Sequence, residues 1–238
     1  MKRNTIFGRA FFMTAIMAAM QISTVPANAA EEASSIARGG RLYDKWFAEN
    51  KAAKPGDDHP AYPVKGGKYG KDASWRCKEC HGWDYRGKDG AYAKGGHATG
   101  IPGIAVAAGK DPKAIADMLR AKPHGYTDEQ LSAKDVSDLA LFVSKGQVDM
   151  AKYIDGGKPK GDAGKGEAHF NTLCAGCHGV DGKKITTGPA LGSVADNGYE
   201  MLHKLLNGQP AEAMPSLRTL DPQIAVDIVA HLQTLPKQ

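Results

Sequence analysis

The chain has few cysteines, a weak charge imbalance and, beyond residue 29, no long apolar run. Its 238 residues include four cysteines, and all four fall within Cys-x-x-Cys-His runs, so none is spare for a disulfide. Lys and Arg exceed Asp and Glu by only 5, which is too small an excess to argue for nucleic acid or anionic lipid as a partner. Because no segment after residue 29 approaches the length of a membrane-spanning helix, a soluble mature protein is expected.

The first residues have the pattern of an export signal. An uncharged apolar stretch over residues 11–20 is too short to cross a bilayer, and Ala27-Asn28-Ala29 is a small-x-small cleavage pattern. We therefore predict a signal peptide over residues 1–29 and a periplasmic mature chain that begins near Ala30, in preference to a retained anchor helix. Removing three basic residues from a net charge of +5 leaves about +2. These three residues are Lys2, Arg3 and Arg9.

Two Cys-x-x-Cys-His runs dominate the chemistry of the sequence. This pattern attaches c-type haem, because two thiols three positions apart at a helix start reach two vinyl groups and the next histidine lies under the iron. A redox thiol pair or a four-cysteine zinc site would not need a histidine after both pairs. We predict two covalently bound haem c groups, with iron ligated by His81 and His178. The attachment residues are Cys77, Cys80, Cys174 and Cys177.

The second half, residues 161–238, resembles the small class I cytochromes c. In that family a helix with a small glycine and an aromatic residue crosses the C-terminal helix, and Gly166 and Phe170 match those two positions. The resemblance further implies that the carbonyl of Pro189 accepts a hydrogen bond from the proximal histidine. It also implies that Met214, which is followed by a proline, is the sixth ligand of the second iron.

The first half repeats this plan, which indicates an internal duplication. Gly39 and Tyr43 stand where Gly166 and Phe170 stand, and helices are expected over residues 115–122 and 131–145. Ser132 is the expected N-cap of the second helix, and its buried stripe is formed by Val136, Leu139, Ala140 and Val143. The expected fold is all-α, with two tandem cytochrome c-like domains over residues 30–150 and 165–238. A loop insert over about residues 49–74 and a short flexible linker over residues 151–164 complete the chain.

The first domain is similar to the first domain of periplasmic dihaem cytochromes found alongside respiratory and sulfur-compound oxidoreductases. The run from Trp75 to Tyr92 carries this resemblance. It implies that several aromatic side chains pack around the porphyrin, although ordinary core positions remain an equal alternative. These are Trp75, Trp83, Tyr85 and Tyr92.

The sixth ligand of the first iron is a separate question, because the matching slot holds no methionine. Aligning Leu131 with Leu220, and Pro123 with Pro210, brings His124 near the position of Met214. We therefore predict His124 as the ligand. Two alternatives stay open: Met118, which is expected to be a core residue of a helix, and His97, in a glycine-rich loop.

If both irons have six ligands, neither has an open position for substrate, which favours an electron carrier with no catalytic residues. Its partners would be redox proteins, a donor and an acceptor, in small and transient contacts. A peroxidase-like dihaem oxidoreductase is the first rival, since a weakly held His124 could open the iron. The second rival is a haem subunit of a larger dehydrogenase or oxidase complex.

Overall fold

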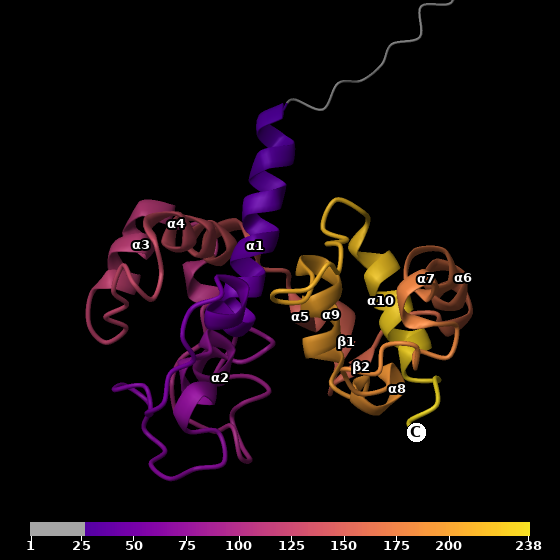
Figure 1. The fold of residues 1–238 in the computed structure, drawn as a ribbon, viewed down its shortest axis with the longest axis horizontal. Helices are drawn as coiled ribbons and strands as arrows, with labels where there is room; N and C mark the ends of the chain where they lie inside the picture. The colour runs from indigo at the N-terminus through magenta and orange to yellow at the C-terminus, as the bar shows by residue number, and fades with distance from the viewer. Residues whose placement is uncertain (1–26) are drawn as a thin grey trace, which may run out of the picture.

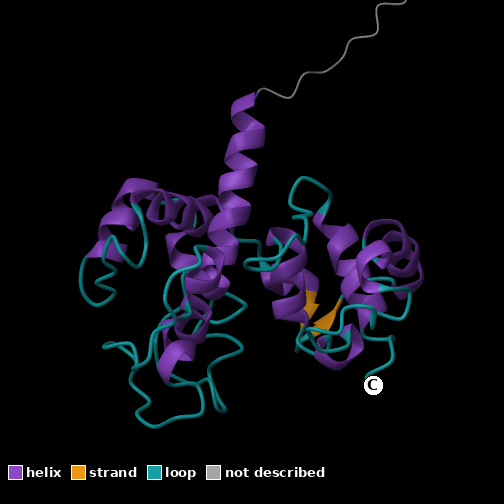
Figure 2. Cartoon of the chain, in the orientation of Figure 1, coloured by secondary structure: helices purple, strands orange, loops and turns teal. Residues whose placement is uncertain are grey.

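The computed structural model describes residues 27–238, which are almost entirely helices and loops (Figures 1 and 2). The predicted signal peptide falls mainly on residues 1–26, outside the described residues. In chain order the helices of the first half are α1 (Ala27–Glu49), α2 (Cys77–His81), α3 (Pro112–Arg120) and α4 (Ala133–Leu141), with short 3-10 turns at 71–75 and 105–107 and a π turn at 142–146. Those of the second half are α5 (Met150–Tyr153), α6 (Ala163–Leu173), α7 (Ala175–His178), α8 (Leu191–Val194), α9 (Gly198–Asn207) and α10 (Pro222–Leu232).

Each half is built on a close crossing of its first long helix with its last. α1 packs against α4, and α6 packs against α10. A Cβ atom at Gly39 would lie 2.1 Å from the carbonyl oxygen of Asp138, and one at Gly166 would lie 1.9 Å from that of Asp227. Only glycine allows helices to approach so closely, so the repeated glycine of the sequence corresponds to a repeated helix crossing.

The starts of the helices follow from local sequence. The side chain of Ser132 accepts a hydrogen bond from the backbone of Asp135, whose carboxylate accepts one in return, so the expected N-cap of α4 is confirmed as a capping box. The side chains of Asp111, Asp162 and Asp221 accept hydrogen bonds from backbone N–H groups in the first turns of α3, α6 and α10. The predicted apolar stripe is also confirmed, because all four of its side chains are buried: Val136, Leu139, Ala140 and Val143.

The segment expected to be a flexible linker is ordered against the second half. It contains α5 and a two-stranded antiparallel hairpin of β1 (Ile154–Asp155) and β2 (Lys158–Pro159). Ile154 is buried, and the carbonyl of Gly157 accepts hydrogen bonds from the backbone of Gly198 (3.1 Å) and the side chain of Gln233 (3.4 Å). The glycine-rich composition of this stretch reflects its hairpin turn, where Gly156 and Gly157 have positive φ, rather than free chain.

The two halves meet where α1 packs against α9, and one hydrophobic cluster continues from the first half into the second. In Figure 1, α1 stands between α4 on one side and α9 on the other. Among residues 27–238, no helix has both the length and the apolar character that crossing a membrane requires.

Candidate haem-binding sites

The first Cys-x-x-Cys-His motif forms α2 and orients its histidine with a backbone carbonyl. The Nδ1 atom of His81 lies 2.7 Å from the carbonyl oxygen of Pro102, and because a carbonyl only accepts, Nδ1 carries the proton. This leaves Nε2 with its lone pair free to bind a metal. The loop that supplies Pro102 is held close to α2, since Gly87 pairs with Pro102 in an isolated β-bridge.

The imidazole rings of His124 and His81 lie close together. The centroids of the two imidazole rings are 6.1 Å apart, and the rings are tilted by 39°. Two metal-to-imidazole bonds of about 2 Å each, with a ring radius added on either side, require a separation of about 6 Å. The Nδ1 atom of His124 donates to the carbonyl of Met118 at 3.3 Å, so its Nε2 is also left unprotonated. The pair has the spacing and the protonation pattern that an iron bound between two histidines needs.

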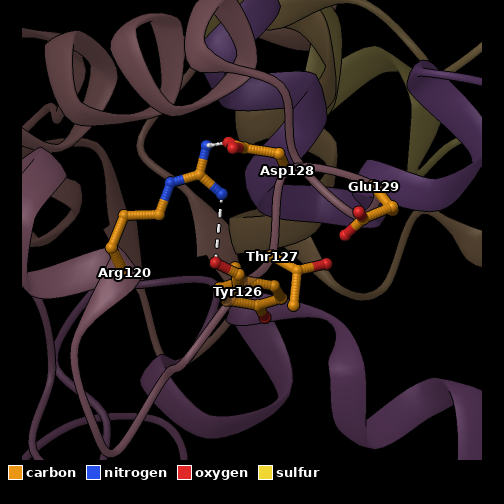
Figure 3. Close-up of a pocket in the computed structure, with 5 residues that line it drawn as sticks. All are labelled: Arg120, Tyr126, Thr127, Asp128 and Glu129. Atoms are coloured by element: carbon orange, nitrogen blue, oxygen red, sulfur yellow. Dashed lines mark hydrogen bonds and ion pairs between the residues drawn. The ribbon is translucent and has the colours of Figure 1, made fainter.

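Arg120, at the end of α3, binds the loop segment that follows His124 (Figure 3). Its guanidinium donates to the backbone carbonyl of Tyr126 at 3.0 Å and to the carboxylate of Asp128 at 2.5 Å. Tyr126 is buried, and its hydroxyl donates in turn to the carbonyl of Trp75 at 3.2 Å. A hollow of about 390 Å³ beside the Arg120 contacts is lined mainly by charged and polar side chains and is open to solvent. It lacks the enclosed apolar walls of a haem pocket.

The two alternative ligands of the first iron lie in other surroundings. The side chain of Met118 is 55% exposed, so its expected place in the core was wrong: α3 turns this residue outward. The Nδ1 atom of His97 lies 2.6 Å from the buried carboxylate of Glu79. The ring of His97 is also stacked on Tyr69 (3.8 Å) and Tyr92 (4.6 Å). His97 therefore already has a set of partners.

No disulfide joins the four motif cysteines, so each remains available for haem attachment. Burial raises the pKa of Cys77 and of Cys80 to about 12, and that of Cys174 to about 11. The described residues hold no group of three or more His, Cys, Asp or Glu side chains arranged around an ion, so the two cysteine pairs do not meet as a zinc site would require.

The aromatic side chains of the first motif form a buried shell. Trp83, Tyr85 and Tyr92 are at most 7% exposed. Tyr43 packs edge-on against Tyr85, and its hydroxyl donates to the carbonyl of Gly82, directly after the motif, at 2.6 Å. The expected role of these residues around a porphyrin stays a prediction, but Tyr85 has an additional contact with the second half, since its hydroxyl lies 2.8 Å from Nδ1 of His203.

His59, in the loop insert, was not among the predicted site residues. This side chain is 5% exposed and packs edge-on against Trp75, with ring centroids 4.5 Å apart. Its Nδ1 accepts a hydrogen bond from the backbone of Ala61 at 3.1 Å, whereas its buried Nε2 has no hydrogen-bond partner. Burial lowers the pKa of His59 and the charge of the nearby His124 lowers it further, so the insert lies close to the proposed ligand. A histidine among loop-forming residues carried no signal of burial.

The second motif lies in more open surroundings. Cys177 is exposed, and three large apolar side chains around the motif are also exposed. These are Leu173 (44%), Val180 (72%) and Ile185 (41%). Within the described residues no hydrogen bond joins His178 to Pro189, so the contact that His81 makes with Pro102 has no counterpart here, and the role expected for Pro189 is not seen.

Met214 lies in the loop between α9 and α10. It is partly buried and packs against the hydrophobic cluster, and its carbonyl oxygen would lie 2.7 Å from a Cβ atom at Gly208. Two hydrogen bonds fix the loop to α9. The backbone N–H of Leu217 donates to the carbonyl of Leu205 (2.9 Å), and the hydroxyl of Ser216 donates to the carbonyl of Leu206 (2.6 Å). The methionine therefore sits on an anchored loop.

Two comparisons with known proteins agree with this arrangement. The family described as cytochrome c oxidase, cbb3-type, subunit III matches residues 161–232. A cytochrome c-553-like protein of Synechocystis sp. is 35% identical over 78 residues, which are 32% of this chain and 71% of that protein. Together with the helical fold, these similarities show that the chain belongs to the cytochrome c family, whose members bind haem c covalently.

Proposed function

We propose that the protein is a periplasmic dihaem cytochrome c that carries electrons between a donor and an acceptor protein. One haem would be held by each half, in domains that span residues 30–150 and 165–238. Bound haem supplies an iron that accepts and releases one electron at a time. The chain's own residues attach the group, supply its axial ligands and set how much water reaches it.

The observation that carries this proposal is the His81–His124 pair. Its 6.1 Å separation leaves room for one metal ion and no further ligand, so the first iron would have six ligands and no open position for substrate. Pro102 would fix the orientation of His81, and Arg120 would hold the loop segment that follows His124.

In the second half, His178 and Met214 would be the axial ligands. Methionine ligation raises the reduction potential of a haem relative to two histidines, so the second haem would have the higher potential. Electrons would then move from the first haem to the second, a direction suited to a relay.

The experiment is an intact-mass measurement followed by a redox titration of the protein purified from the periplasm. We expect the mass of the chain starting near Ala30 plus two haems, and two one-electron steps with both ferric haems low-spin. A mass equal to the bare chain would rule out haem attachment. A first haem that is high-spin as isolated would have an open iron, which would make the peroxidase-like reading the better one.

A further inference from the structure

The face between α1 and α9 is polar, although it is buried. His203, on α9, has no exposed surface. Its Nε2 donates to the backbone carbonyl of Gly40 at 2.9 Å, and its Nδ1 accepts from the hydroxyl of Tyr85 at 2.8 Å. Both ring nitrogens of a second-half residue are therefore satisfied by the first half, which fixes its tautomer and orientation.

The shape of this contact is as specific as its hydrogen bonds. A Cβ atom at Gly40 would lie 2.2 Å from the side-chain carbon of Asn207, so α9 touches the backbone of α1. The ring of His203 is enclosed by Trp83, Tyr43 and Phe142, all from the first half, with centroid distances of 5.0, 5.7 and 5.6 Å. These contacts leave no room for a water layer between the helices.

A buried ion-pair network connects this contact to the first haem motif. Asp44 is 1% exposed and lies 2.5 Å from the ammonium group of Lys204, and it also binds Arg76. Arg76 donates to the backbone carbonyl of Asp44 at 2.8 Å and directly precedes Cys77. The Lys204 and Arg76 charges lower the pKa of Asp44 to about 2 despite its burial.

A second set of bonds leads to the loop of Met214. Asn207, at the end of α9, accepts from Arg41 of α1 at 2.9 Å and from Arg218 at 2.5 Å. Arg218 follows Met214 by four residues and lies over the ring of Phe142, 6.0 Å from its centroid. The same face therefore contacts the attachment motif of one half and the proposed ligand loop of the other.

Interfaces between domains that move are usually polar and open to water. Here the central histidine is fully buried, and the hydrophobic cluster passes through the contact without a break. Separating the halves would expose the Trp83, Tyr43 and Phe142 rings to water and break the bonds of His203, Asp44 and Asn207 together.

We propose that this contact, the His203 lock, is permanent, and that it makes the two halves one cooperative folding unit with a fixed distance between their haem motifs. His203 is a positioning residue in it. Resting on the proposed function, the consequence is that one electron leaves one iron and enters the other within the same chain, with no bond made or broken and no co-reactant.

The test uses the haem-loaded protein, with haem content checked by mass before each measurement. Calorimetry of the wild type should give one unfolding transition, and His203→Ala should divide it into two or leave one half melting at least 5 °C lower, about the shift expected for 1 kcal/mol or more. Tyr85→Phe removes only one hydroxyl and should give a smaller change of the same kind, which covers the case in which His203→Ala fails to fold.

His231→Ala is the matched control. His231 is 8% exposed and packs on Phe170 within the second half, away from α1. This variant should lower the melting temperature while keeping a single transition, since it weakens one half without uncoupling the two. Two independent transitions in the wild type, or a single unshifted transition in both His203→Ala and Tyr85→Phe, would overturn the lock.

A kinetic readout separates the lock from the proposed function. After rapid photoreduction of one haem, the electron should equilibrate between the two haems at a rate independent of protein concentration, and His203→Ala should slow this step at least tenfold. If the wild type instead equilibrates only in proportion to its concentration, the lock is wrong although the protein is still a dihaem carrier. If the protein carried only one haem, the proposed function would be wrong. Calorimetry would then still test the His203 lock.

Discussion

The two halves share a helix crossing but cover their Cys-x-x-Cys-His motifs differently. Around the first motif, Trp83 and Tyr85 are each 2% exposed, and the insert and the second half lie against it. After the second motif, Val180 is 72% exposed. The helical frame is the same in both halves, so the difference in exposure comes from the loop insert and from α9 of the second half, which cover the first motif only.

Under the proposed function, the two halves would have different tasks. An enclosed motif with two histidines suits a haem of low potential that exchanges electrons within the molecule. The second haem, which would have the higher potential, would then be the one that passes electrons to a partner protein.

Removing one cysteine pair tests whether both halves bind haem. In Cys77→Ala/Cys80→Ala the first haem should be lost from the covalent mass, and in Cys174→Ala/Cys177→Ala the second. Intact mass spectrometry of the denatured protein reads the result directly. If either double variant kept the mass of two haems, the assignment of that motif would be wrong.

Replacing the distal ligands tests whether the halves differ in ligation. His124→Ala should convert only the first ferric haem to a high-spin form, because the loss of a sixth ligand weakens the ligand field at the iron. Electron paramagnetic resonance measures the spin state. Met214→Ala should instead abolish the far-red charge-transfer band of the second haem. Should Met214→Ala leave that band intact, another residue ligates the second iron.

The glycine crossings test whether the shared frame matters equally in both halves. Gly39→Ala and Gly166→Ala place a Cβ atom 2.1 and 1.9 Å from a backbone carbonyl, and each should lower the free energy of unfolding by about 3 kcal/mol. Chemical denaturation measures the loss. Gly56→Ala and Gly188→Ala are matched controls, since no atom lies within 4 Å of the added Cβ, and comparable losses in them would refute the steric explanation.

Acid should weaken the contact between the halves. Burial lowers the pKa of His203 from 6.5 to about 4. The charge of Asp44 raises this pKa, whereas the charges of Lys204 and Arg218 act in the same direction as burial. The unfolded chain binds this proton below pH 6.5 and the folded chain does not, so stability is complete above pH 6.5 and falls by about 3 kcal/mol between pH 6.5 and 4. Asp44, with its pKa lowered from 3.8 to about 2, adds a further loss between those two values.

The pH dependence is measured by denaturation at a series of pH values, with His203→Gln as the comparison. Glutamine has no proton to gain, so the fall between pH 6.5 and 4 should be shallower in this variant. Equal slopes in the variant and the wild type would assign the acid sensitivity to other groups.

The smallest effect is expected for Met118→Ala. Because this side chain is 55% exposed, its loss should change the free energy of unfolding by less than about 0.5 kcal/mol and leave the spin state of the first haem unchanged. A high-spin first haem in this variant would move the ligand from His124 to Met118.

The sequence was a good guide to the helices because their signals are local. Ser132 caps α4, and the three-to-four spacing of Val136, Leu139 and Val143 predicts the face that is buried. The linker was misjudged because glycine marks a hairpin turn as readily as a flexible chain, and Gly156 and Gly157 form the turn.

Some residues of the candidate sites could be predicted from the sequence and others could not. The motif residues follow from a fixed spacing, and His124 follows from the repeat, which the approach of His124 to His81 supports. His59 and His203 depend on contacts between segments far apart in the chain, and no spacing within one segment reveals such contacts. Met118 was misjudged because an apolar residue type does not determine which face of a short helix it occupies.

Gly39 and Gly40 are neighbours on α1, yet Gly39 admits Asp138 of α4 and Gly40 admits Asn207 of α9. Successive residues of an α-helix point about 100° apart around its axis. The two glycines therefore fix the angle around the α1 axis between the directions from which α4 and α9 approach. Inserting one residue between them would turn the second half around α1 by about a quarter of a circle. This protein is therefore expected to tolerate an inserted residue in its loops but not between these two glycines.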